Sequence, residues 1–95
     1  MKIGTSTDNG RLTVAIEGRL DTNTSPELEE ALKFDGVTEV VFDFAELEYI
    51  SSAGLRVLMG AHKAMAAVGG RMSVVNPNAV VKGVFDITGM SGIML

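Results

Sequence analysis

The sequence has no cysteine and only one histidine, His62. The absence of cysteine excludes disulfide bonds and thiolate metal sites, and a single histidine excludes a histidine-rich metal centre. No apolar run approaches the roughly 18 residues that a membrane-spanning helix requires. The N-terminal residues also lack the apolar core of a signal peptide. We therefore expect a cytoplasmic protein that has no metal site and does not bind a membrane.

Positive charge and aromatic side chains are also scarce. Eight Lys and Arg residues stand against twelve Asp and Glu residues, which gives a net charge of −4, and 5% of the residues are aromatic. The phosphate backbone of a nucleic acid repels such an acidic domain, so the natural expectation is a protein partner. The length of 95 residues and the apolar share of 46% predict one globular domain over residues 1–95 with a single small core.

The patterning of the first half of the chain predicts a β-hairpin followed by a helix. Residues 3–7 are weakly strand-like, and residues 11–18 alternate apolar and polar side chains like a half-buried strand. Between them, the Asp-Asn-Gly sequence at 8–10 tolerates the positive φ of a tight hairpin turn. The helix is predicted to start with Ser25 as its N-cap and Pro26 as its first helical residue.

The second half predicts a strand, a helix, a second strand and a last helix. Residues 39–44 are dense in β-branched and aromatic side chains and predict a central strand. Residues 46–52 are expected to be a loop, and the apolar spacing over 54–68 predicts an amphipathic helix. A strand at 71–76 follows, and then a helix at 79–87 that the Asn-Pro-Asn sequence at 76–78 is predicted to cap. The expected fold is α/β: a small mixed β-sheet, built from an antiparallel hairpin and a parallel βαβ unit and covered by helices.

Two adjacent serines, Ser51 and Ser52, lie where the predicted loop meets the helix at 54–68. A serine at a helix start is commonly an N-cap, which stabilises the helix by about 1 kcal/mol. A helix N-terminus also stabilises an anion, so a phosphoryl group on Ser52 would be tolerated without a change of fold. Local physics leaves both interpretations open.

A catalytic serine lacks a base. His62 lies ten residues further along the same helix, about 15 Å from Ser52 at 1.5 Å per residue, which is beyond hydrogen-bond reach. The sequence Ser-Ser-Ala-Gly also differs from the G-x-S-x-G elbow of hydrolases. We expect no catalytic residue and no cofactor. Asp21 and Asp43 either flank the serine loop and fix it by hydrogen bonds, or cap their own turns.

Three segments, in this order, resemble the STAS domain and specifically the bacterial anti-sigma factor antagonists. They are GRLDTNTSPELEEAL, VVFDFAELEYISSAGLRVL and GGRMSVVNPNAVVKGVFDITGM. The resemblance implies a small α/β switch protein that binds an anti-sigma factor while it is unphosphorylated, so that a sigma factor is released. The anti-sigma factor is also a serine kinase, and its phosphorylation of one serine ends the binding. A phosphatase restores the binding.

The resemblance also implies which serine is the acceptor. The family pattern is Asp-Ser-Ser/Thr-Gly-Leu, and alignment on Gly54 and Leu55 puts Ser52 at the acceptor position. Ser51 stands where the family often has Asp and is the second candidate, and Ala53 replaces the second hydroxyl.

The partner surface that the resemblance implies lies around the acceptor. We define the partner surface as Asp21, Thr22, Glu48, Ser51, Ser52 and Arg56. Asp21 matches an aspartate that the family has in the adjacent loop, and we expect Leu55 to turn inward and Arg56 to face the partner. The alternatives are a STAS module that binds a partner without phosphorylation, and an enzyme or nucleotide-binding protein. We expect a monomer.

Overall fold

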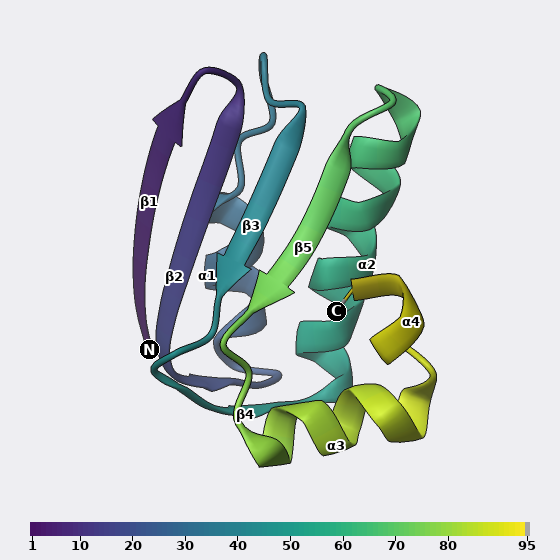
Figure 1. Cartoon of the computed structure of the whole chain (residues 1–95). Helices are drawn as coiled ribbons and strands as arrows, with labels where there is room; N and C mark the ends of the chain where they lie inside the picture. The colour runs from purple at the N-terminus through teal and green to yellow at the C-terminus, as the bar shows by residue number, and fades with distance from the viewer. Residues whose placement is uncertain (95) are drawn as a thin grey trace.

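The computed structural model describes residues 1–94 (Figure 1). In that range the chain forms five strands and four helices. They are β1 (Lys2–Asp8), β2 (Arg11–Leu20), α1 (Ser25–Ala31), β3 (Glu39–Asp43), β4 (Leu47–Ile50), α2 (Ser52–Ala67), β5 (Arg71–Val75), α3 (Ala79–Thr88) and α4 (Ser91–Met94).

The main sheet is mixed, with its strands in the order β1-β2-β3-β5. β1 and β2 are antiparallel, whereas β3 is parallel to both of its neighbours, β2 and β5. The helices α1 and α2 cover one face of this sheet, and α3 lies at the end where the parallel strands finish (Figure 1). The structure therefore confirms the expected α/β fold. It also confirms the hairpin turn, because Asn9 and Gly10 have φ of 50° and 81°.

The core lies between the sheet and the two helices that cover it. In β2, Leu12, Val14 and Ile16 are all buried, because a period of two residues puts them on the helix-covered face. Phe42 of β3 contributes to this core from the sheet and Leu58 of α2 from the helices, and both side chains are fully buried. Burial of these apolar side chains is the dominant favourable contribution to the folding of such a domain.

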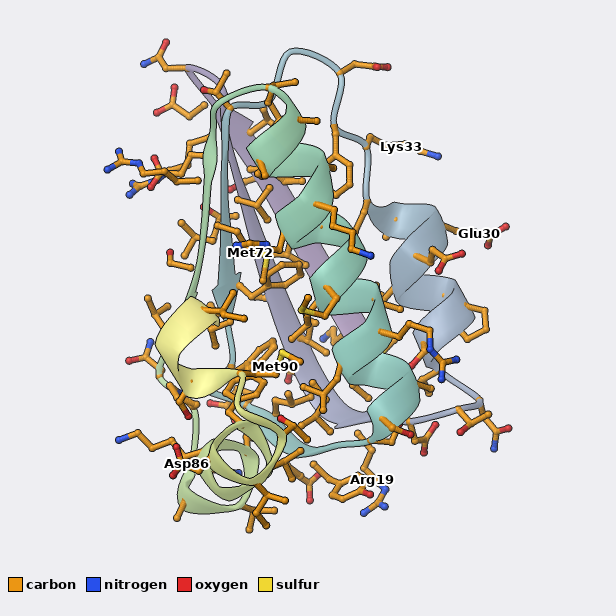
Figure 2. All side chains as sticks on the ribbon, turned by 90° about the vertical axis from the view of Figure 1, so that its right-hand side faces the viewer. Arg19, Glu30, Lys33, Met72, Asp86 and Met90 are labelled. Carbon is orange, nitrogen blue, oxygen red and sulfur yellow. The ribbon has the colours of Figure 1, made fainter. Side chains whose placement is uncertain are left out.

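The C-terminal segments pack onto the same core. Met72 of β5 and Met90, which precedes α4, are half-buried and contact it (Figure 2). The Ser91 hydroxyl donates a hydrogen bond to the carboxylate of Asp86 and so ties α4 to α3. By contrast, Glu30 at the end of α1 projects outward (Figure 2).

The loop expected over residues 46–52 is largely a strand, so that prediction is wrong. β4 pairs in parallel with the last part of β2, with a shift in register between Gly18 and Arg19, whose partners are Leu47 and Tyr49. Its first and last residues, Leu47 and Ile50, are buried. A strand of four residues is too short to show a clear alternation, and it is stabilised by a partner about thirty residues away in the sequence.

The start of α1 also differs from the prediction by one residue. Thr24 is the N-cap, Ser25 is the first helical residue, and Pro26 is the second. The Ser25 hydroxyl donates to the carbonyl of Asp21 at 2.6 Å, and the residue is only 4% exposed. Ser25 therefore fixes the loop before α1 rather than capping the helix. The predicted cap of α3 is confirmed, because the Asn78 side chain accepts from the N–H of Val81 at 2.8 Å.

Candidate functional site

The two serines occupy different positions at the start of α2. Ser51 is the N-cap: its backbone is extended, and its hydroxyl oxygen accepts from the N–H of Gly54 at 3.4 Å. Ser52 is the first residue of the helix and is exposed. Within residues 1–94 its hydroxyl has no hydrogen-bond partner. The interpretation of Ser52 as the cap is therefore wrong, because Ser51 fills that role and leaves the Ser52 hydroxyl available.

Glycine at position 54 allows α2 to begin directly against the sheet. A Cβ atom on Gly54 would lie 2.8 Å from Ile50 Cγ1 and 2.8 Å from Leu20 Cγ, closer than Cβ atoms approach in real proteins. The next residue, Leu55, is buried, and Arg56 is exposed, as the sequence predicts. This close contact fixes which residues of the first turn face the solvent.

Asp21 lies in the loop between β2 and α1 and organises that loop. Its Oδ1 atom accepts from the N–H of Asn23 at 3.0 Å, and from the N–H and the hydroxyl of Thr24, each at 3.1 Å. The hydrogen bond from the Thr24 N–H is the main reason that the pKa of Asp21 lies below its ordinary value. Burial opposes this lowering of the pKa, whereas the Thr24 hydroxyl, the Asn23 N–H and Arg19 add to it. Asp21 is therefore ionised at neutral pH.

Of the two roles considered for the aspartates, the structure supports the capping role. Asp43 follows the same pattern as Asp21: its Oδ1 accepts from the N–H of Ala45 at 3.0 Å and from the Asn76 side chain at 3.2 Å. Among the described residues, neither carboxylate is hydrogen-bonded to Ser52. Each aspartate fixes its own turn.

Arg19 and Tyr49 also belong to this site, although the sequence did not single them out. They are register neighbours on β2 and β4, and the Arg19 guanidinium lies 4.6 Å from the centre of the Tyr49 ring. Arg19 Nε is also 3.9 Å from Asp21 Oδ2. Figure 2 shows Arg19 at the same end of the molecule as the first turn of α2. The sequence pattern over residues 47–50 does not indicate a strand, so it cannot predict that Arg19 and Tyr49 pair across β2 and β4.

A small hollow lies between the first turns of α1 and α2. Its volume is about 250 Å³. Its lining residues are Thr22, Ser25, Pro26, Glu29, Ala53, Arg56 and Val57. Two residues of the predicted partner surface, Thr22 and Arg56, therefore meet at one depression next to Ser52.

The start of β4 is held in place by Asn78, the residue that caps α3. The Asn78 side-chain amide donates to the carbonyls of Leu47 at 2.9 Å and Glu48 at 3.4 Å. Glu48 itself is exposed on β4.

The partner surface defined from the sequence combines four exposed residues with two half-buried ones. The exposed residues are Thr22, Glu48, Ser52 and Arg56, and the half-buried ones are Asp21 and Ser51.

The described chain shows no metal centre. Among residues 1–94 no group of three or more His, Cys, Asp or Glu side chains is arranged to hold a metal ion. No helix in the same range is long and apolar enough to cross a membrane. What the site offers chemically is an accessible hydroxyl, on Ser52, with both acidic and basic side chains around it.

The chain is similar in sequence to a known domain family and to characterised members of it. Residues 2–95 match the STAS domain family. The chain is 32% identical over 89 residues to an anti-sigma F factor antagonist of Paenibacillus polymyxa, a match covering 90% of this chain and 76% of the relative. It is 31% identical over 97 residues to an anti-sigma-B factor antagonist of Staphylococcus epidermidis, covering 99% and 90% of the two chains.

The fold has close counterparts among solved structures. The anti-sigma factor antagonist SpoIIAA in its unphosphorylated form superposes with a TM-score of 0.88 at 22% identity, covering 99% of this chain and 86% of that one. The phosphorylated form of SpoIIAA, a Bacillus cell fate determinant, gives a TM-score of 0.80 at 20% identity, covering 99% and 89%.

Proposed function

The chain belongs to the STAS domain family and, within it, to the anti-sigma factor antagonists, and we propose that it is a partner switch controlled by phosphorylation of Ser52. Its class consists of regulatory proteins rather than enzymes, and the natural partner of an antagonist is an anti-sigma factor. In its unphosphorylated form the protein binds an anti-sigma factor that is also a serine kinase, and the sigma factor is released. Phosphorylation by that kinase ends the binding, and a phosphatase restores it.

The observation that carries this proposal is that the two adjacent serines have different roles at the start of α2. Ser51 caps α2 through Gly54, whereas the Ser52 hydroxyl is exposed at the first helical position. The acceptor hydroxyl is therefore not needed to hold the helix together. In support, SpoIIAA, which has the same fold, has been solved in unphosphorylated and phosphorylated forms.

The transfer itself needs only an accessible hydroxyl from this chain. The Ser52 oxygen attacks the γ-phosphorus of ATP held by the kinase with its magnesium ion. A new P–O bond forms to Ser52, and the bond between the γ-phosphorus and the oxygen that leaves with ADP breaks. The hydroxyl proton passes to a base on the kinase. This chain supplies the acceptor and the docking surface.

Added charge explains why phosphorylation ends the binding. A phosphoserine carries about −1.5 to −2 charges at pH 7. The surface around Ser52 already contains the carboxylates of Asp21 and Glu48. A partner shaped to this surface would have to bury the phosphate or meet like charge, and both cost binding free energy. Because Ser51 retains the cap, the fold of the domain is not altered.

Phosphorylation mapping tests this proposal directly. The protein is incubated with ATP and the anti-sigma factor kinase of the same organism, and the modified residue is located by mass spectrometry. We expect the label on Ser52 in the wild type and in Ser51→Ala, and no label in Ser52→Ala. A label absent from both serines would refute the proposed switch.

A constitutive STAS interaction module is the second candidate function. It is favoured by Ser51, which stands where members of the family often carry an aspartate. Ser52→Asp separates the two functions: the switch predicts a large loss of affinity for the anti-sigma factor, and the constitutive module predicts none. With either function, we propose a monomeric single-domain protein of the cytoplasm.

A further inference from the structure

We propose that Arg56 binds the phosphate on Ser52, so that phosphorylation withdraws Arg56 from the partner and pairs it within its own helix. This inference rests on the proposed function, because it concerns the phosphorylated form of the same site. It assigns to Arg56 two successive roles: a contact for an acidic side chain of the partner in one state, and a counter-ion for the phosphate in the other.

The position of Arg56 on α2 carries the first part of the argument. Residues 52 and 56 are four apart in α2, so their Cβ atoms are neighbours on one face, about 5–6 Å apart. Both residues are exposed. Long side chains on a helix lean toward its N-terminus, over the preceding turn. The Arg56 side chain lines the hollow between α1 and α2, and from its position on the helix it can reach over the preceding turn to a phosphate on Ser52.

The distribution of charge around the site carries the second part. Arg19 is already engaged, since it lies 3.9 Å from Asp21 and 4.6 Å from the Tyr49 ring centre. In the described part of the chain, Arg56 has no carboxylate within 4.0 Å, although Glu29 lines the same hollow. Arg56 is thus the cation that a phosphate on Ser52 can recruit without breaking an existing ion pair.

If Arg56 pairs with the phosphate, phosphorylation of Ser52 weakens partner binding in two ways. The phosphate adds negative charge at Ser52, and the same event neutralises the positive charge that Arg56 offers to the partner. A carboxylate on the partner opposite Arg56 then loses its counter-ion while it approaches a dianion. The kind of partner surface that fits is therefore acidic where it meets the first turns of α2.

The test uses protein in which phosphoserine is installed at position 52 during translation, so that no kinase is needed. The second pKa of the phosphate is measured by ³¹P NMR titration in the wild type and in Arg56→Gln. We expect Arg56→Gln to raise that pKa by about half a unit, because the nearby cation favours the dianion. Arg56→Lys should restore most of the difference, and the difference should shrink in 1 M salt.

Lys63→Gln is the matched control, because it removes one positive charge from an exposed position of α2 about two turns further from the phosphate. It should leave the phosphate pKa unchanged. Equal phosphate pKa values in the wild type and Arg56→Gln, both verified as folded by their amide spectra, would overturn the inference. So would an equal shift in Lys63→Gln. If the kinase fails to label Ser52, the proposed function fails, and this titration still reports on Arg56 independently.

Discussion

The backbone N–H of Ser51 donates a hydrogen bond of 2.9 Å to the carbonyl of Leu20. This bond joins the residue that caps α2 to the last residue of β2, across a sequence separation of about thirty residues. The next residue after Leu20 is Asp21, so the loop that Asp21 organises lies directly beside the two serines. The site is therefore assembled by the pairing of β2 with β4.

Gly54→Ala should destabilise the domain by about 1–3 kcal/mol, because the new methyl group would overlap the buried side chains of Leu20 and Ile50. Urea unfolding measures the change. Gly60→Ala is the matched control on the same helix: it is exposed and has nothing within 4 Å of the added Cβ. It should stabilise the protein by about 0.5–1 kcal/mol. Equal effects of the two substitutions would show that position 54 is not tightly packed.

Ser51→Ala should cost about 0.5–1 kcal/mol of stability, toward the lower end of the range for N-caps because the bond to Gly54 is long. Ser52→Ala should change the free energy of unfolding by no more than about 0.5 kcal/mol, as expected of an exposed residue. Thermal or urea unfolding of the two variants compares them. The reverse order would assign the cap to Ser52 and remove the basis for an available acceptor hydroxyl.

Asp21 should make stability dependent on acid pH. Its pKa in the folded protein is lowered from the ordinary 3.8, mainly by the Thr24 N–H. The contribution of a carboxylate with a lowered pKa is fully present above its unfolded pKa and is lost as the pH falls through the folded value. Stability should therefore fall below about pH 4, and Asp21→Asn should show a smaller fall. Urea unfolding between pH 7 and pH 3 measures both; parallel curves would contradict the assignment.

Asn78→Ala should cost about 1–3 kcal/mol, because the side chain both caps α3 and donates to the carbonyl of Leu47. Asn78→Asp separates the two roles: it keeps the oxygen that accepts from Val81 and loses the amide donor. We expect Asn78→Asp to be intermediate in urea unfolding. If it were as stable as the wild type, the bond from α3 to β4 would contribute nothing.

Much of the fold followed from local patterns. The alternation in β2, the Asn9-Gly10 turn and the cap at Asn78 were all predicted from residues within one element. The two features that the sequence did not predict, β4 and the contact of Arg19 with Tyr49, both depend on contacts between distant parts of the chain. β4 was predicted as a loop because its pairing partner lies far away in the sequence, and Arg19 was missed because its contact with Tyr49 depends on that pairing.

The same distinction holds within the site. The sequence by itself determined that the chain is an α/β domain without cysteine, with two serines at a helix start and an arginine one turn later, because composition and periodicity are local properties. Only the tertiary structure decided which serine caps the helix and which is available. That choice depends on where α2 meets the sheet, and the contact of Gly54 with Leu20 and Ile50 fixes that position.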